Sequence, residues 1–309
     1  MDLPAAPRFL ALFATLPTRQ AAGRMRVWRA LRALGCATLR DGVFLLPEGE
    51  EHARGLENVA QEVRAVQGTA EILFLDGRDE VERKRLVALF DRSADYAALV
   101  GKLGKAKPDD GKALRNLRRE LAALAEIDFF PSEARRQATA ALAALEAATT
   151  GEPSNGASRI RRFASADFQG RTWATRKNLW VDRMASAWLI RRFIDRKAKF
   201  LWLDNPKKCP RQALGFDFDG AAFTHAGGMV SYEVLAASFG LDTDPALAKI
   251  GAIVHCLDVG GVPMAEAPGI EAVLAGLRAA ADDDDSLLTA AGRVFDGLYH
   301  AFRLEKAHD

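Results

Sequence analysis

Residues 171–195 constrain the fold most strongly, because they join an extended stretch to a helix that is apolar on nearly every side. Thr172, Trp173 and Thr175 favour a β-strand, and a helix is expected to begin near Asp182. Projected at about 100° per residue, the large apolar side chains of this helix spread almost all round its axis. Other elements must cover such a helix, so the sequence predicts that it lies buried in a domain core.

Two arginines flank the point where this strand leads into the helix. Arg183 falls in the first turn of the helix, and Arg176 stands seven residues earlier, at the end of the strand. A helix N-terminus presents unpaired N–H groups and a partial positive charge, and guanidinium groups add planar pairs of donors. The junction is therefore predicted to bind an oxyanion. In the alternative, structural interpretation, the arginines pair with buried carboxylates such as Asp182 or Asp217 and hold the fold together.

The chain has 309 residues, which is enough for two domains that each bury a core. A hydrophobic content of 49%, a charged content of 27% and a formal net charge of +2 are typical of a soluble globular protein. The positive charge is concentrated locally, since residues 159–199 contain 12 Lys or Arg against three acidic residues. The cysteines are too sparse for a disulfide framework, and no apolar stretch approaches the length of a membrane span. A cytoplasmic location without membrane contact is expected.

The first part of the chain alternates in the order βαββαβ, which predicts a ferredoxin-like domain. The expected strands and helices are 9–16, 20–34, 37–39, 43–46, 50–66 and 69–75, with a hairpin at Asp41-Gly42. Two long helical stretches follow, at 78–105 and at 111–148, the second interrupted at Pro131. These helices could pack against the domain or against a second copy of it, so a homodimer is expected.

Residues 151–158 have the composition of a linker and separate a domain at 1–150 from a domain at 159–309. The second domain is expected to be mixed α/β, and its strand order stays open. Its expected strands lie at 172–175, 200–203, 214–218 and 221–224, and its later helices at 232–239, 245–257, 270–280 and 287–304. The fold class predicted for the whole chain is α/β (α+β).

A cluster of arginines near the N-terminus is a candidate DNA-binding surface. Arg19, Arg24, Arg26 and Arg29 lie on or next to one expected helix, with few acidic residues nearby. Such side chains contact phosphates and give an affinity that depends on salt rather than on base sequence. The alternative is an ordinary solvated helix face.

Two histidines and two carboxylates form a candidate metal site. His225 ends an expected strand, Glu233 falls in the first turn of the next helix, and His255 and Asp258 are three residues apart on a later helix. Together they could bind a divalent first-row metal, or His225 alone could donate a hydrogen bond to an anion. Alternatively, His255 is a core histidine held by Asp258. The common hydrolase, zincin and P-loop motifs are missing from the sequence, so these enzyme classes lack support. A divalent metal stays a candidate cofactor, and no enzymatic activity is assigned.

Four runs of sequence resemble the N- and C-terminal domains of the ChrB family of chromate resistance regulatory proteins. They are GRMRVWRALRALGCATLRDGVFLLP at 23–47, TWATRKNLWVDRMASAWLIRRFID at 172–195, FTHAGGMVSYEVL at 223–235 and AIVHCLDVGG at 252–261. The resemblance implies a cytoplasmic, chromate-responsive transcriptional repressor that binds operator DNA and releases it when chromate arrives.

Combined with the residues, the resemblance suggests that chromate, a tetrahedral dianion, binds to Arg176 and Arg183, with His225 as a third donor. The second hypothesis is an enzyme in the C-terminal domain that converts an oxyanion, resembling a chromate reductase or depending on a metal. It would use His225, Glu233, His255 and Asp258.

Overall fold

The computed structural model describes residues 8–17, 21–150 and 160–305. The chain divides into two compact units, the first formed by Met1–Leu99 with Arg115–Ser132 and the second by Val100–Leu114 with Glu133–Asp309. Residues 100–114 and 133–150, which lie within the domain predicted at 1–150, are part of the second unit. The expected linker at 151–158 lies outside the described residues.

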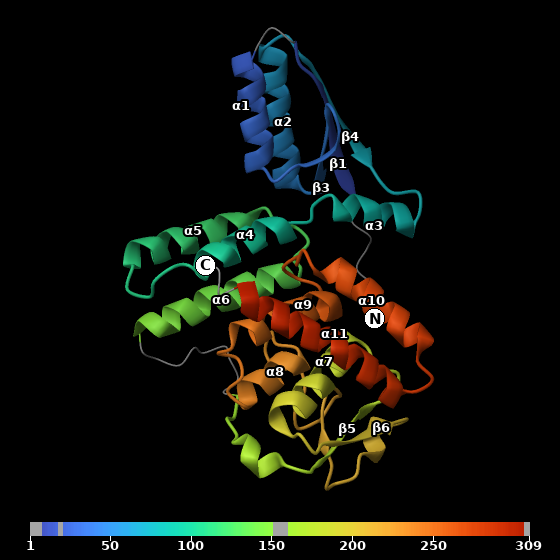
Figure 1. The fold of residues 1–309 in the computed structure, drawn as a ribbon. Helices are drawn as coiled ribbons and strands as arrows, with labels where there is room; N and C mark the ends of the chain where they lie inside the picture. The colour runs from blue at the N-terminus through green and yellow to red at the C-terminus, as the bar shows by residue number, and fades with distance from the viewer. Residues whose placement is uncertain (1–7, 18–20, 151–159, 306–309) are drawn as a thin grey trace. The chain divides into compact units, whose positions relative to one another are not determined.

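The first unit contains a four-stranded antiparallel sheet with the strand order β2-β3-β1-β4 (Figure 1). Its elements are β1 (Phe9–Thr15), α1 (Ala21–Ala33), β2 (Ala37–Arg40), β3 (Val43–Pro47), α2 (Glu50–Ala65) and β4 (Thr69–Leu75). The βαββαβ order and the α+β class are as predicted, while the ferredoxin-like assignment stays a prediction. Gly42 in the β2–β3 hairpin has φ of +75°, and a Cβ there would lie 2.7 Å from the carbonyl oxygen of Ala14. Only glycine fits this turn.

Side chains alternate along β1 between two separate cores, as the period of a strand requires. Leu10 and Leu12 pack with Val27 and Leu31 of α1 and with residues of α2. On the other face, Phe9 stacks on Phe90, and both belong to a second apolar cluster. Both faces of β1 are therefore partly covered, whereas Leu73 and Phe74 of β4 are exposed.

The two long helical stretches that the sequence predicts are each divided in the structure. They comprise α3 (Glu80–Ala88), α4 (Ser93–Leu103), α5 (Gly111–Glu126) and α6 (Glu133–Thr150). The interruption at Pro131 is confirmed. The continuous helix at 78–105 is wrong, because the carboxylate of Asp91 accepts hydrogen bonds from the backbone N–H and the hydroxyl of Ser93 and starts a new helix there.

The second unit is built on a three-stranded parallel sheet with the order β6-β5-β7. Its sheet region consists of η1 (Ser165–Phe168), β5 (Thr172–Arg176), α7 (Val181–Leu189), the π-helical turn η2 (Ile190–Ile194), β6 (Lys199–Leu203), η3 (Pro206–Lys208) and β7 (Leu214–Gly215). The predicted strand at 214–218 ends early, and that at 221–224 is only a bridge between Phe216 and Phe223. Asp217 has φ of +54°, which is incompatible with an extended strand.

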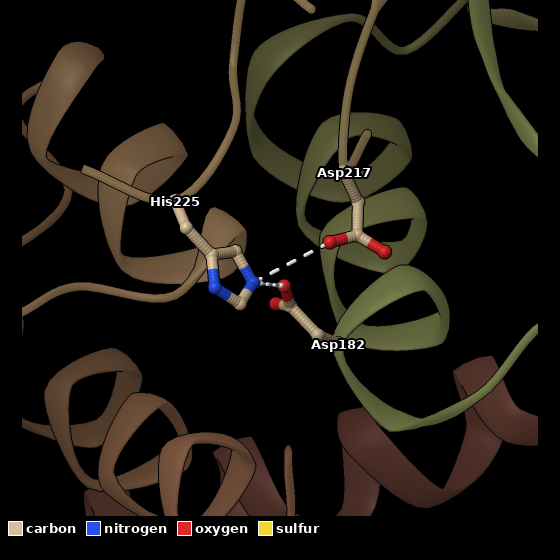
Figure 2. A group of neighbouring side chains, drawn as sticks. All are labelled: Asp182, Asp217 and His225. Atoms are coloured by element: carbon tan, nitrogen blue, oxygen red, sulfur yellow. Dashed lines mark hydrogen bonds and ion pairs between the residues drawn. The ribbon is translucent and has the colours of Figure 1, made fainter. Parts of the chain in front are cut away.

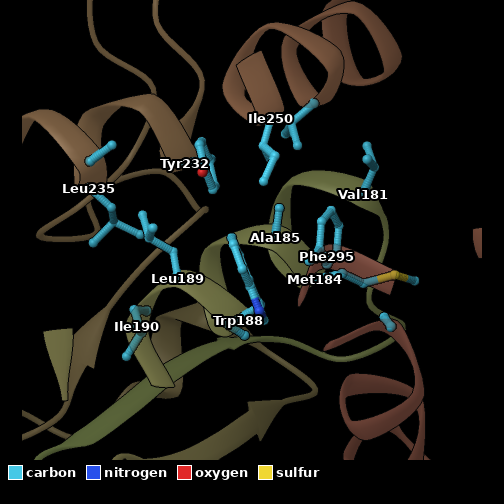
Figure 3. Close-up of a cluster of buried hydrophobic side chains, with 14 of the residues drawn as sticks. Val181, Met184, Ala185, Trp188, Leu189, Ile190, Tyr232, Leu235, Ile250 and Phe295 are labelled. Atoms are coloured by element: carbon cyan, nitrogen blue, oxygen red, sulfur yellow. The ribbon is translucent and has the colours of Figure 1, made fainter. Parts of the chain in front are cut away.

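Four later helices of the second unit lie close to their predicted positions. They are α8 (Ser231–Ser238), α9 (Pro245–Val259), α10 (Ala267–Ala280) and α11 (Asp284–Glu305). Helix α7 packs against α8, α9 and α11, and its apolar side chains meet theirs in one core (Figure 3). Every residue of α7 except Arg183 is buried, so the predicted buried helix is confirmed. Among the described residues, no helix combines the length and the apolar character needed to cross a bilayer.

A buried carboxylate joins the end of η2 to the start of β5. Asp195 is 0% exposed and accepts four hydrogen bonds, three from backbone N–H groups and one from the indole of Trp173. Because these bonds connect segments on both sides of the helix, Asp195 fixes where α7 and η2 lie relative to the sheet.

Candidate functional site

A pocket of about 580 Å³ opens at the carboxyl ends of the three parallel strands of the second unit. Arg176 ends β5, Asn205 follows β6 and Asp217 follows β7, so each strand delivers a polar side chain to the same edge. In open parallel sheets, ligands bind outside the carboxyl ends of the strands. The first turn of α7 completes the wall with Asp182 and Arg183.

Arg183 is the more buried of the two arginines, with 18% of its side chain exposed. Its Nη1 donates to the carbonyl oxygens of residues 176, 177 and 178, and its Nε lies 3.2 Å from Oδ2 of Asp217. Burial lowers the pKa of the guanidinium, which the neighbouring Asp217 charge partly offsets. These contacts orient Arg183 and leave Nη2 without a partner among the described residues.

Arg176 is held more loosely, since 49% of its side chain is exposed. Its Nη2 lies 3.3 Å from the carbonyl oxygen of Asp217 and 3.7 Å from Oδ2 of the same residue. Both arginines therefore converge on Asp217. The alternative in which the arginines pair with buried carboxylates predicted this contact with Asp217. Asp182, the other carboxylate that it named, has a different role.

Asp182 connects the first turn of α7 to the start of α8. The residue is 1% exposed, and it accepts hydrogen bonds from the backbone N–H groups of Ser231, at 3.0 Å, and Tyr232, at 2.9 Å. Those N–H groups have no partner within their own helix, so the carboxylate satisfies them. Asp182 thereby brings α8, and the chain that precedes it, to the pocket.

His225 lies among three carboxylates. Its Nε2 is 3.3 Å from Oδ2 of Asp182, 3.5 Å from Oδ1 of Asp217 and 3.5 Å from Oδ2 of Asp258. Figure 2 shows the imidazole pointing between Asp182 and Asp217. The hydrogen bond to Asp182 raises the pKa of His225, as do the charges of the other two carboxylates, although partial burial opposes them.

Two of these carboxylates hold their protons unusually tightly. Burial and the nearby charge of Asp182 raise the pKa of Asp217 to about 6, although Ser231 donates a hydrogen bond to it. The same two causes raise the pKa of Asp258. Mutual repulsion between carboxylates in a partly desolvated site has this effect. Raised carboxyl pKa values of this kind are typical of functional sites.

The backbone N–H groups just before α7 already donate to a carboxylate of the protein itself. Asp284, in the acidic run where α11 begins, accepts hydrogen bonds of 3.0 Å from the N–H groups of Asn178 and Leu179. A ligand in the pocket would therefore be held mainly by side chains rather than by these two amides.

The four residues predicted as a metal site do not converge on one point. His225 and Asp258 face the pocket, whereas His255 and Glu233 contact each other at 2.8 Å and form a separate cluster with Glu133 of α6. His255 is 2% exposed and is held by Glu233, not by Asp258 as the structural alternative expected. Sequence reasoning missed Glu133 as a partner, since it is more than a hundred residues away. Asp217 was predicted only as a possible partner of the arginines, and its place beside His225 was not predicted.

The candidate DNA-binding arginines lie on the exposed side of α1. This helix buries one stripe formed by Gly23, Val27 and Leu31, while Arg24, Arg26 and Arg29 are exposed. None of these three forms an ion pair with another described residue. Arg19 lies outside the described residues.

A second basic segment, at the start of α3, is different. Arg83 lies 3.3 Å from Asp76, and Lys84 lies 2.8 Å from Glu80. The charges of Arg83 and Lys84 are therefore paired, unlike those of Arg24, Arg26 and Arg29 among the described residues.

Together the fold and the pocket define a two-unit α+β protein whose second unit carries a charged site at the end of a parallel sheet. Residues 24–126 match the family model described as Protein ChrB, N-terminal, and residues 173–302 match the model described as ChrB, C-terminal domain. The chain is 46% identical to Protein ChrB of Cupriavidus metallidurans over 315 aligned positions, which cover 97% of each protein.

The chain therefore belongs to the ChrB family. This membership supports a function related to chromate resistance. No solved structure matches the chain.

Proposed function

We propose that the protein is a cytoplasmic, chromate-responsive transcriptional repressor of chromate resistance genes. In this proposal a homodimer binds operator DNA through the arginines of α1, and chromate binds in the pocket of the second unit. The observation that carries the proposal is the convergence of Arg176 and Arg183 on one pocket at the carboxyl ends of the parallel strands.

The pocket arginines suit a tetrahedral dianion. Nη2 of Arg183 and the half-exposed guanidinium of Arg176 can donate to separate oxygens of one ion, and His225 with its raised pKa adds a charged donor when it is protonated. Charge-assisted hydrogen bonds of this kind are about twice as strong as neutral ones.

The test measures binding of the purified protein to DNA from upstream of its own gene, by fluorescence anisotropy, with and without chromate. Chromate is expected to release the DNA, and equal concentrations of sulfate are expected to have little effect. Unchanged binding in the presence of chromate would remove the sensor function, and release by both ions alike would remove its selectivity.

The arginines of α1 predict a specific salt dependence. Replacing Arg24, Arg26 and Arg29 together by glutamine is expected to weaken DNA binding and to reduce the slope of log affinity against log salt by about 2.7, which is 0.9 for each lost phosphate contact. The matched control replaces Arg83 and Lys84, whose charges are already paired, and its slope is expected to stay close to that of the wild type. Equal slopes for all three proteins would exclude α1 from the DNA interface.

The second candidate function is a metal-dependent enzyme that converts an oxyanion. The convergence of three carboxylates on His225 favours it, because such groups bind divalent metals. A turnover assay that follows chromate absorbance with added divalent metal and a reductant tests it. Chromate consumption no faster than without protein would eliminate this candidate.

A further inference from the structure

The arrangement around His225 is not that of an ordinary hydrogen bond. Three carboxylate oxygens lie 3.3, 3.5 and 3.5 Å from its Nε2. An imidazole nitrogen carries at most one hydrogen, so it can donate to only one of the three. The other two carboxylates face the same point without a proton between them and the ring.

These separations match those between ligands of a single metal ion. At metal–ligand distances of about 2.1 Å, two ligands in tetrahedral geometry lie about 3.4 Å apart. The nearest ligand atoms of Asp182, Asp217 and His225 also lie within 4.8 Å of one another, which places all three in reach of one ion. Asp258 of α9 is not part of this group, although its Oδ2 lies 3.5 Å from Nε2 of His225.

The side chains of this cluster are held in place before any ion arrives. Two backbone N–H groups of α8 fix Asp182, while the Ser231 hydroxyl and Nε of Arg183 fix Asp217. Partners of this kind orient metal ligands and are part of most metal sites. By contrast, the ion pair with His225 is the only one that Asp258 forms with a described residue.

The charge of the pocket gives an independent reason for a cation. A His225 that binds a metal through Nε2 is neutral. Asp182, Asp217 and Asp258 then outnumber Arg176 and Arg183 by one negative charge, which disfavours an anion. A bound divalent cation changes this excess to one positive charge, which favours an oxyanion.

We propose that Asp182, Asp217 and His225 bind one divalent transition-metal cation, and that this cation contacts the oxyanion that Arg176 and Arg183 hold. Two carboxylates and one imidazole favour a cation of the Mn²⁺ or Fe²⁺ kind over thiolate-preferring metals. The metal site stands on its own geometry, while its contact with the oxyanion rests on the proposed function.

The test uses Mn²⁺ and the full-length protein after treatment with a chelator, in the absence of DNA and chromate. Free Mn²⁺ is measured by electron paramagnetic resonance during a titration. We expect about one tightly bound Mn²⁺ per chain, and we expect Asp217→Asn and His225→Gln each to weaken binding by at least about 100-fold, because even outer partners of a metal contribute 10–100-fold.

The matched control is Asp219→Asn, since Asp219 lines the same pocket and is exposed but does not contact His225. Its Mn²⁺ affinity is expected to equal that of the wild type, and thermal melting verifies that each variant is folded. Absence of tight binding in the wild type, or equal binding in all four proteins, would overturn the metal site. If the wild type binds Mn²⁺ but chromate does not release it from DNA, the metal site stands and only the proposed function is contradicted.

Discussion

Replacing Arg183 by methionine is expected to raise the chromate concentration needed to release half of the bound DNA by about 100-fold. Loss of one or two charge-assisted hydrogen bonds to the ion, at about 1.5–3 kcal/mol each, accounts for an effect of this size. Affinity for DNA without chromate is expected to stay unchanged, because Arg183 belongs to the second unit and α1 to the first. Anisotropy titrations at fixed DNA concentration measure both quantities.

Arg183 also donates to three backbone carbonyl oxygens, so its loss could act through folding. The variant Arg176→Gln separates the two causes. Among the described residues, the guanidinium of Arg176 contacts only Asp217, and half of the Arg176 side chain is exposed. A reduced response in Arg176→Gln with an unchanged melting temperature supports binding of the ion. If the response is lost only in variants that melt earlier, the arginines are structural.

Replacing Asp195 by alanine is expected to lower the free energy of unfolding by about 3 kcal/mol at pH 7. The change leaves four donors without their shared acceptor, and hydrogen bonds to charged groups contribute about 1.5–3 kcal/mol each before the chain relaxes. Urea unfolding followed by tryptophan fluorescence measures the loss. The control Asp204→Ala removes a carboxylate that is 84% exposed and is expected to change stability little.

The same carboxylate makes the effect depend on pH in a defined direction. Burial tends to raise the pKa of Asp195, but the donors from Gly170, Trp173, Arg171 and Lys197 outweigh burial and hold that pKa below its usual value. Its contribution is therefore fully present above the unfolded pKa of about 3.9 and is lost as the pH falls through the folded pKa. A difference between wild type and variant that stays constant from pH 7 to pH 2 would contradict this assignment.

Local sequence patterns predicted the elements of the fold well. The apolar helix after β5 is buried, the Asp41-Gly42 hairpin is present, and the βαββαβ order is found. Each of these depends on residues close together in the chain. The strand predicted at 214–218 ends at Gly215, because the positive φ of Asp217 comes from its place in the folded site, which no local pattern reveals.

The candidate site was predicted only in part, because its residues meet through tertiary structure. Arg176, Arg183 and His225 line one pocket, as the sequence suggested. The convergence of Asp182, Asp217 and Asp258 on His225 depends on the order β6-β5-β7 and on how α8 and α9 pack against α7, neither of which the sequence determines by inspection. Spacing along α9 suggested that His255 joins Asp258, but the helix directs the two side chains to different partners.

Helix α9 therefore contacts two different sites through residues one turn apart. Asp258 reaches His225 at the pocket, and His255, three residues earlier and about 4.5 Å along the helix axis, contacts Glu133 in the first turn of α6. Any rotation of α9 that draws Asp258 toward a ligand would also turn His255 against Glu133. The His255–Glu133 contact in the first turn of α6 would then differ between the occupied and the empty pocket. In sequence, α6 begins directly after Ser132, the last residue of the first unit.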